Sequence, residues 1–240
     1  AQMEMGGKNP TIVLADADLD LAAKLVALAG FMMTGQVCTA TSRAIVEESV
    51  ADEFTEKLVA EAKARNVGNG MHEGVTMGPA VCASELESNL DYVKIAQNEG
   101  AELCWGGERL SDGDLKHGYF MSPAVIGNVK NDMRIAQEEV FGPVVGVVKA
   151  GDFDEAISLA NDIEYGLSAS IITRDLNKAM RYTDQIEAGV VKINQISTGL
   201  ALQAPFGGVK HSSTNSFKEQ GASAVDFYTQ VKSVYLDYSA

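Results

Sequence analysis

Residues 144–194 read VVGVVKAGDFDEAISLANDIEYGLSASIITRDLNKAMRYTDQIEAGVVKIN, and this stretch decides the fold class. Three apolar runs that are typical of buried strands lie at 144–148, 168–173 and 189–194. Two longer segments with helical spacing separate them, at 153–161 and 176–187. Strands that alternate with helices in this way predict an α/β fold with a largely parallel sheet and right-handed crossovers.

The same alternation extends back toward the start of the chain. Further strands are expected at 11–14, 44–46, 102–105 and 124–126, and further helices after Asp16 or Asp18, at 54–62 and at 84–99. The helix after Asp18 is apolar on nearly all sides, so we expect it to be buried and to end at Gly35. Beyond Asn194 the alternation stops. An irregular loop (195–215), a short helix (218–227) and a strand (231–238) that pairs with another chain or domain are expected there.

The composition fits a soluble globular protein with a substantial core, since 46% of the 240 residues are hydrophobic and 22% are charged. A formal charge of −14 argues against nucleic-acid and anionic-membrane partners. The longest apolar run, 25–33, is shorter than the roughly 20 residues that span a bilayer. No signal-peptide pattern precedes it, so a cytoplasmic protein with free thiols is expected.

Cys38 is the candidate nucleophile, within Gly35-Gln36-Val37-Cys38-Thr39-Ala40 and followed by Ser42-Arg43. A cysteine is most often a small buried hydrophobe, and Cys82 and Cys104 keep that interpretation. Around Cys38, however, small residues leave room for a substrate, and backbone N–H groups of a turn could receive an oxyanion. Selective labelling of Cys38 by iodoacetamide would identify a thiol that ionises readily.

Glu4 is the candidate general base, in Glu4-Met5-Gly6-Gly7-Lys8-Asn9-Pro10. The glycine pair indicates a tight backbone or a close ligand, although the carboxylate could equally be a solvated strand end. The acidic loop 138–143 joins an acidic pair, an aromatic residue and a rigid turn, and it could equally be an ordinary loop that leads into the strand at 144–148. The three histidines are isolated, so papain-type hydrolysis is unsupported, and no cluster has metal-ligand spacing. The residues alone therefore predict an α/β domain with a cysteine nucleophile and a carboxylate base.

Taken together, these motifs resemble the aldehyde dehydrogenase superfamily. The two motifs above look like its glutamate and cysteine motifs. Four more follow in family order: Glu138-Glu139-Val140-Phe141-Gly142-Pro143, Asn161 with Tyr165-Gly166-Leu167, Gly189 with Asn194, and Pro205-Phe206-Gly207-Gly208-Val209-Lys210. The resemblance implies a three-layer catalytic domain at 1–200. It also implies a tail at 201–240 that returns to a nucleotide-binding domain and an oligomerisation sheet, neither of which is in this sequence.

The resemblance also implies roles for individual residues. Cys38 would attack an aldehyde and form a thiohemiacetal and then a thioester, and Glu4 would activate the water that releases the acid. Glu139 would hold the nicotinamide ribose of NAD or NADP, with Phe141 beside the nicotinamide and Met5 and Gly6 near the cofactor. Glu219 would assist deacylation, although its motif is about two residues longer than the usual family pattern.

The tail resembles the branch that acts on α-ketoglutaric semialdehyde (2,5-dioxopentanoate). The full-length parent would be a homodimer or homotetramer acting on a small aldehyde. Two other hypotheses stay open. The isolated chain could lack dehydrogenase activity and be at most a weak thiol esterase, or it could be a structural protein that kept the fold.

Overall fold

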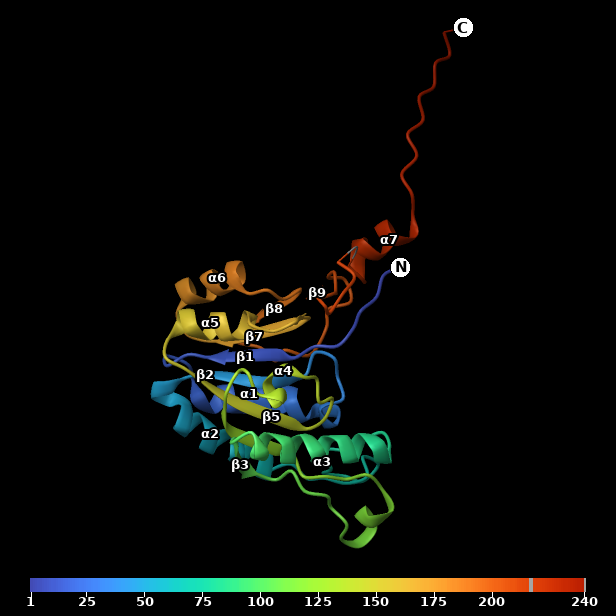
Figure 1. The fold of residues 1–240 in the computed structure, drawn as a ribbon. Coiled ribbons are helices and arrows are strands. Elements are labelled where there is room, and N and C mark those ends of the chain that lie inside the picture. Colours follow the sequence, from blue (N-terminus) through green and yellow to red (C-terminus); the bar gives the residue numbers. More distant parts are fainter. Residues whose placement is uncertain (216–217, 240) are drawn as a thin grey trace.

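The computed structural model describes residues 1–215 and 218–239, and a seven-stranded sheet forms its centre (Figure 1). The strand order is β3-β4-β5-β2-β1-β7-β8. Their bounds are β1 (Asn9–Val13), β2 (Thr41–Glu47), β3 (Glu102–Trp105), β4 (Ala124–Val129), β5 (Val144–Ala150), β7 (Ser168–Ile172) and β8 (Val190–Ile193). All neighbours are parallel except β3 and β4. The predicted α/β fold with a mainly parallel sheet is confirmed.

Helices cover both faces of the sheet and give three layers (Figure 1). One face packs against α1 (Leu19–Phe31) and α2 (Glu48–Lys63), and its apolar core includes Val26 and Phe54. The other face packs against α3 (Ala83–Asn98), α4 (Arg134–Gln137), α5 (Phe153–Asn161) and α6 (Leu176–Gln185). A sheet with apolar residues on both faces needs this double cover, because either face would otherwise stand in water.

The helix α1 differs from its prediction in two respects. It begins as expected after Asp18, whose side chain accepts a hydrogen bond from the Leu21 N–H. It ends at Phe31 rather than at Gly35, and a 3-10 turn, η1 (Met32–Gly35), follows. Its outer face is also exposed, since Leu21 and Leu28 are 43% and 36% exposed. These leucines lie seven residues apart, hence on one side of the helix, so an all-round apolar pattern did not mean complete burial.

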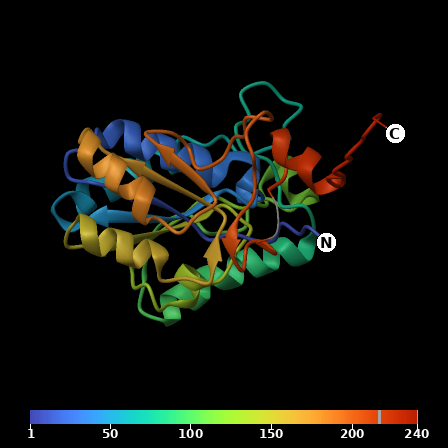
Figure 2. The same cartoon turned by 90° about the horizontal axis from the view of Figure 1, so that it is seen from above.

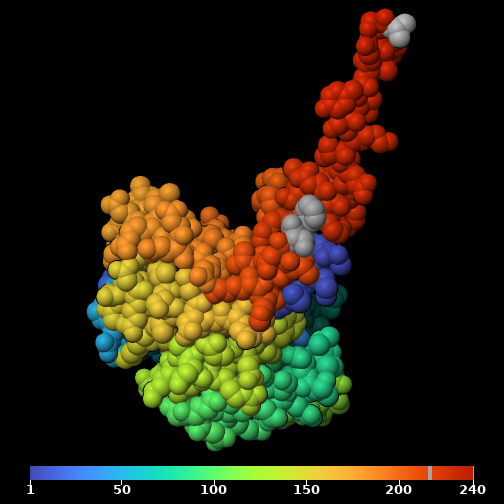
Figure 3. Space-filling view, turned by 45° about the horizontal axis from the view of Figure 1, so that its top comes forward, coloured from blue at the N-terminus to red at the C-terminus, as the bar shows by residue number. Residues whose placement is uncertain are grey.

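The last part of the chain leaves the three-layer body. Here β9 (Val209–Lys210) pairs with β6 (Tyr165–Gly166), and α7 (Gly221–Tyr228) follows. Earlier in the chain, a short 3-10 helix, η2 (Gly113–His117), lies in the loop between β3 and β4. Residues 229–239 have no regular secondary structure within this chain, so the pairing of 231–238 with another chain or domain stays a prediction. Figure 3 shows this segment as a narrow projection, with Val231 and Tyr235 at 99% and 95% exposure. No neighbouring strand is present to pair with its backbone among the described residues.

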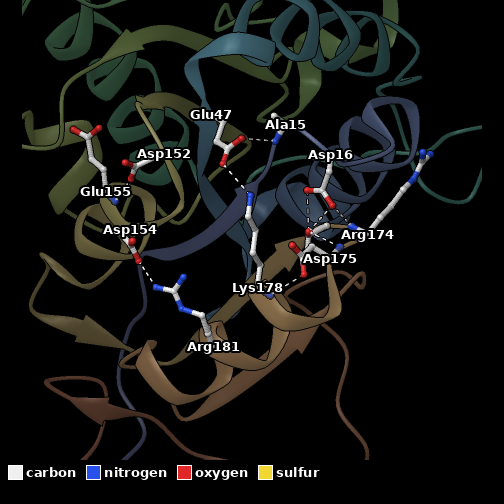
Figure 4. A network of polar contacts seen from close by, with 11 residues as sticks. Ala15, Asp16, Glu47, Asp152, Asp154, Glu155, Arg174, Asp175, Lys178 and Arg181 are labelled. Atoms are coloured by element: carbon white, nitrogen blue, oxygen red, sulfur yellow. Dashed lines mark hydrogen bonds and ion pairs between the residues drawn. The ribbon is translucent and has the colours of Figure 1, made fainter.

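At the carboxyl ends of the strands, a network of polar contacts links the residues that follow neighbouring strands (Figure 4). Asp16, after β1, accepts hydrogen bonds from the Thr173 hydroxyl and the Arg174 N–H. Glu47, at the end of β2, accepts from the Ala15 N–H at 2.7 Å and lies 3.8 Å from Lys178. Because these polar groups bind one another, they stabilise this end of the sheet.

Candidate active site

The sequence-predicted site residues gather at the opposite, amino-terminal ends of the strands. Parallel strands begin at one edge of a sheet, and the motifs immediately precede three neighbouring strands. Gly6-Gly7 leads into β1, Cys38 into β2, and Glu139 to Phe141 into β5. The strand order β5-β2-β1 therefore places the three segments side by side.

Cys38 lies in a tight turn after η1, where the Ala40 N–H donates to the Val37 carbonyl at 2.9 Å. The Asn9 side chain fixes this turn. Its amide Nδ2 donates to the carbonyls of Cys38 and Ala40, both at 2.8 Å, and its Oδ1 accepts from the Ser168 N–H at 3.0 Å. One buried side chain thus joins β1, the cysteine turn and β7.

Ser197, in the loop after β8, holds the other side of the same turn. Its hydroxyl donates to the Thr39 carbonyl at 2.7 Å and lies 2.8 Å from the Thr41 hydroxyl. The Ser197 carbonyl accepts from the Ser168 hydroxyl at 2.8 Å. Sequence reasoning assigned no role to Asn9, Ser168 or Ser197. Only Asn9, within the quoted glutamate motif, had a signal in the sequence.

The Cys38 thiol is half-buried and its surroundings disfavour the thiolate. Burial raises the pKa of Cys38, and the negative charges of Glu139 and, more weakly, Glu4 raise it further. The backbone N–H groups of Thr39 and Cys38 act in the other direction but do not outweigh them. These N–H groups are the donors that an oxyanion formed at Cys38 would need.

Glu139 rests on the backbone of Gly6 and Gly7, which we call the glycine ledge. Its Oε1 accepts a hydrogen bond from the Gly7 N–H at 3.0 Å. A Cβ on Gly6 would lie 2.1 Å from Glu139 Oε2, so only glycine allows this approach. Burial raises the pKa of Glu139, although the Gly7 N–H and the charge of Lys8 oppose the rise. The carboxylate is thus fixed beside the cysteine turn.

Phe141 follows Glu139 in a left-handed conformation with φ of 56°. Its side chain is 40% exposed and therefore open to a ligand. The next residue, Gly142, presses its carbonyl against Gly35, where a Cβ would come within 2.1 Å of the oxygen. Gly35 also has a positive φ of 67°, so this contact joins the Glu139 loop to η1.

Glu4 faces the segment after residue 205. Its Oε2 accepts from the Gly208 N–H at 3.0 Å and its Oε1 accepts from the Gln2 amide at 2.8 Å. No hydrogen bond joins Glu4 to Cys38 within residues 1–215 and 218–239, although its charge acts on the thiol. The neighbouring Met5 donates its N–H to the Ser212 carbonyl and exposes 39% of its surface.

Glu219 reaches the same region through the backbone. Its N–H and carbonyl both pair with Phe206 at 2.6 Å, just before Gly207 and Gly208. Its side chain is exposed and lines an open cavity of about 290 Å³ with Gln2 and Tyr228. The N-terminus and α7 accordingly lie on one side of the molecule (Figure 2).

The arrangement supplies a thiol, backbone N–H groups directed at it, and two carboxylates, Glu139 and Glu4, whose charges act on it. Such a set suits nucleophilic attack on a carbonyl followed by a step assisted by a base. No group of three or more metal-binding side chains lies close together in the described ranges. None of the helices in those ranges has the length and apolarity that a bilayer crossing requires.

Comparison with known proteins agrees with this geometry. Residues 1–234 match the aldehyde dehydrogenase family. The chain is 47% identical over 235 residues to the α-ketoglutaric semialdehyde dehydrogenase of Bacillus subtilis and 52% identical over 238 residues to the α-ketoglutarate semialdehyde dehydrogenase of Haloferax volcanii. It is also 43% identical to the 2,5-dioxopentanoate dehydrogenase of Saccharolobus solfataricus. These matches cover 98–99% of this chain and 48–49% of each relative, so the chain spans about half their length.

Solved structures show the same fold. A betaine aldehyde dehydrogenase from Staphylococcus aureus in complex with NAD⁺ has a TM-score of 0.91 at 40% identity, over 95% of this chain and 44% of that chain. An NAD-dependent aldehyde dehydrogenase from Sinorhizobium meliloti has a TM-score of 0.93 at 35% identity, over 100% of this chain and 46% of that chain.

Proposed function

Because the chain belongs to the aldehyde dehydrogenase family, we propose that it is the catalytic half of an enzyme that oxidises an aldehyde to a carboxylic acid with NAD or NADP. The observation that carries the proposal is the convergence of Cys38, Glu4 and Glu139 around the glycine ledge. The isolated chain spans only about half of its relatives, so the activity is proposed for the full-length parent.

The residues present fit a nicotinamide cofactor. Glu139 offers a half-buried carboxylate whose one hydrogen-bond donor within residues 1–215 and 218–239 is the Gly7 N–H, so acceptor capacity remains for ribose hydroxyls. The absence of a side chain at Gly6 lets the Glu139 carboxylate lie there, and Met5 and Phe141 are exposed to a ligand. When bound, NAD or NADP supplies the two-electron acceptor of the oxidation.

Cys38 carries the covalent chemistry in this proposal. Its thiolate attacks the aldehyde carbon and gives a thiohemiacetal, whose oxygen accepts from the Cys38 N–H. Oxidation then leaves the acyl group on the sulfur as a thioester. Because the pKa of Cys38 is raised by burial and by Glu139, a base has to take the thiol proton. Glu4 is the proposed base, and it passes this proton to solvent before the thioester is hydrolysed.

Glu4 completes the cycle by taking a proton from the water that hydrolyses the thioester. The contact with the Gly208 N–H holds the Glu4 carboxylate in place before this step. Glu219, joined to Phe206 next to that contact, would assist deacylation from the cavity near Gln2.

The aldehyde we propose is α-ketoglutaric semialdehyde. The names of the three relatives at 43–52% identity support this choice. We also propose that the parent is a cytoplasmic homodimer or homotetramer. The 240-residue chain alone, in contrast, would lack dehydrogenase activity and be at most a weak thiol esterase.

The test is the Cys38→Ser variant of the full-length parent, assayed for reduced cofactor with α-ketoglutaric semialdehyde. We expect kcat to fall by on the order of 1000-fold or more, because serine is a far weaker nucleophile at neutral pH. Cys104→Ser, which removes a thiol from the sheet edge opposite β8, is the matched control and should keep full activity. A fully active Cys38→Ser enzyme would refute the proposal, and a structural protein would show no activity even before the change.

A further inference from the structure

Lys8 is a buried amine to which the proposed reaction assigns no role. It is 2% exposed, and its Nζ has no hydrogen-bond partner among the residues that the structure describes. It lines a small pocket of about 10 Å³ with Tyr165 and Glu187, the size of one water molecule. A buried ammonium without a partner is costly, so its presence needs a reason.

The position of Lys8 connects it to Glu139. It directly follows the glycine ledge, whose Gly7 N–H binds Glu139 Oε1 at 3.0 Å. Its own carbonyl accepts from Arg43 Nε at 3.2 Å, so the backbone on both sides of Lys8 is fixed. Lys8 is thus the residue next to the backbone N–H that binds Glu139.

The charged groups that face Lys8 differ in how well they are already neutralised. Arg43 on β2 repels it, and Glu138 and Glu139, just before β5, attract it. Glu138 is held by Arg134 at 2.8 Å and by the Tyr92 hydroxyl at 2.6 Å. Around the small cavity, Glu187 is paired with Lys210, and Tyr165 has a pKa raised by burial.

Glu139 has no such cation in contact within the described part of the chain, and its only donor there is the Gly7 N–H. We propose that Lys8 is a positioning residue that acts through Glu139, its buried ammonium keeping the Glu139 carboxylate ionised on the glycine ledge and ready to bind the cofactor ribose. The ribose contact rests on the proposed function, whereas the coupling between the two side chains does not.

The directions of the pKa shifts agree with this coupling. Burial lowers the pKa of Lys8 to about 7, Arg43 lowers it further, and Glu139 and Glu138 oppose both. Burial raises the pKa of Glu139, and the charge of Lys8 opposes that rise. Loss of the Lys8 charge therefore moves Glu139 toward its neutral form, which is a weaker hydrogen-bond acceptor.

The decisive experiment titrates Glu139 in the 240-residue chain. Glutamate carboxyl carbons are labelled with ¹³C, and the Glu139→Gln variant identifies the Glu139 signal. We expect Lys8→Met to raise the midpoint of this titration by on the order of one pH unit. Lys149→Met, which removes a surface charge paired with Asp52, should leave it unchanged. Lys8→Arg should restore the original midpoint.

An unchanged midpoint in a folded Lys8→Met protein would overturn the proposal. Lys8→Gln, neutral and of similar length, replaces Lys8→Met if that variant does not fold. Because neither cofactor nor turnover enters the titration, its result does not depend on the dehydrogenase assignment. In the full-length enzyme, the same variant should raise KM for the cofactor by about tenfold and change kcat less. Equal loss in both parameters would count against a role in cofactor binding.

Discussion

Cys38 and Cys82 differ in exposure and in the direction in which their surroundings shift the thiol pKa. Cys82 is exposed at the start of α3, and a hydrogen bond with Ser84 and the Glu85 N–H lower its pKa. Burial and Glu139 raise the pKa of Cys38. We therefore expect iodoacetamide at neutral pH to label Cys82 before Cys38 in the isolated chain, measured by peptide mass analysis.

This order reverses what a readily ionised Cys38 would give. The sequence shows a thiol among small residues, but it does not show that a carboxylate from residue 139 lies beside it. Faster labelling of Cys38 would mean that Glu139 lies farther from the sulfur than the structure has it.

Glu139 itself should slow the reaction of Cys38. Glu139→Gln removes a negative charge that raises the pKa of Cys38. More thiolate is then present at each pH below that pKa, so alkylation of Cys38 should become several-fold faster. The measurement uses a Cys82→Ser background, and Glu138→Gln, a neighbouring carboxylate already bound by Arg134, is the control. A rate that is the same in Glu139→Gln would remove Glu139 from the environment of the thiol.

The buried charge of Lys8 should lower the stability of the folded protein. The pKa of Lys8 is about 7 in the folded protein, compared with the usual 10.5 in an unfolded chain. Between pH 7 and 10.5 the unfolded chain therefore binds more protons than the folded one. The cost is full below pH 7 and disappears as the pH rises toward 10.5. Lys8→Met should thus raise the free energy of unfolding at pH 6 by at most about 5 kcal/mol, with the gain shrinking at high pH. Urea unfolding at several pH values checks this, and a loss of stability at pH 6 would point to a packing role instead.

At the scale of single elements, local patterns predicted most of the strands and helices, and the errors have physical causes. The runs 144–148 and 168–173 became β5 and β7 because continuous apolar residues suit a strand buried on both faces. The end of α1 was missed because Met33 and Thr34 take left-handed conformations without a glycine. Their tertiary contacts decide this, such as the hydrogen bond from Thr34 to the Gly78 carbonyl at 3.1 Å.

The strand β2 depends on Arg43, which follows the cysteine motif. Its guanidinium is fully buried and donates to the carbonyls of Lys8, Leu159 and Ala160 and to the Asn131 amide oxygen. Arg43→Met leaves these buried acceptors without donors, so we expect a loss of about 3–5 kcal/mol in the free energy of unfolding. Arg109→Met, at an exposed position, should change it by less than about 0.5 kcal/mol. Equal effects in urea unfolding would contradict the role of Arg43 as the anchor of β2.

At the scale of the whole molecule, the two ends of the sheet have different uses. In open α/β sheets ligands usually bind at the carboxyl ends of the strands, but here that end is closed by Asp16, Glu47 and their partners (Figure 4). The proposed site occupies the amino ends. The sequence named Cys38, Glu4 and Glu139 as candidates for the site, and these roles stay predictions. It could not predict which carboxylate lies next to Cys38, because that depends on the strand order β5-β2-β1.

The projecting segment 229–239 gives the last prediction. Its side chains bury almost nothing, with Val231 and Tyr235 nearly fully exposed. Removal of residues 229–240 from the isolated chain should therefore leave Tm within about 2 °C of its original value, because little apolar surface is lost from the core.

The same removal from the full-length parent should have a different result. A segment with unpaired backbone groups and exposed apolar side chains is unfavourable in water. Pairing with the sheet of another subunit would bury both. If the segment pairs with another subunit, as the sequence predicts, sedimentation should show the homodimer or homotetramer replaced by a smaller species. A second full-length variant, in which serine replaces Val231, Val234 and Leu236, keeps the backbone of the segment and removes only its apolar contacts. An intact assembly in both variants would place the subunit contact elsewhere in the parent.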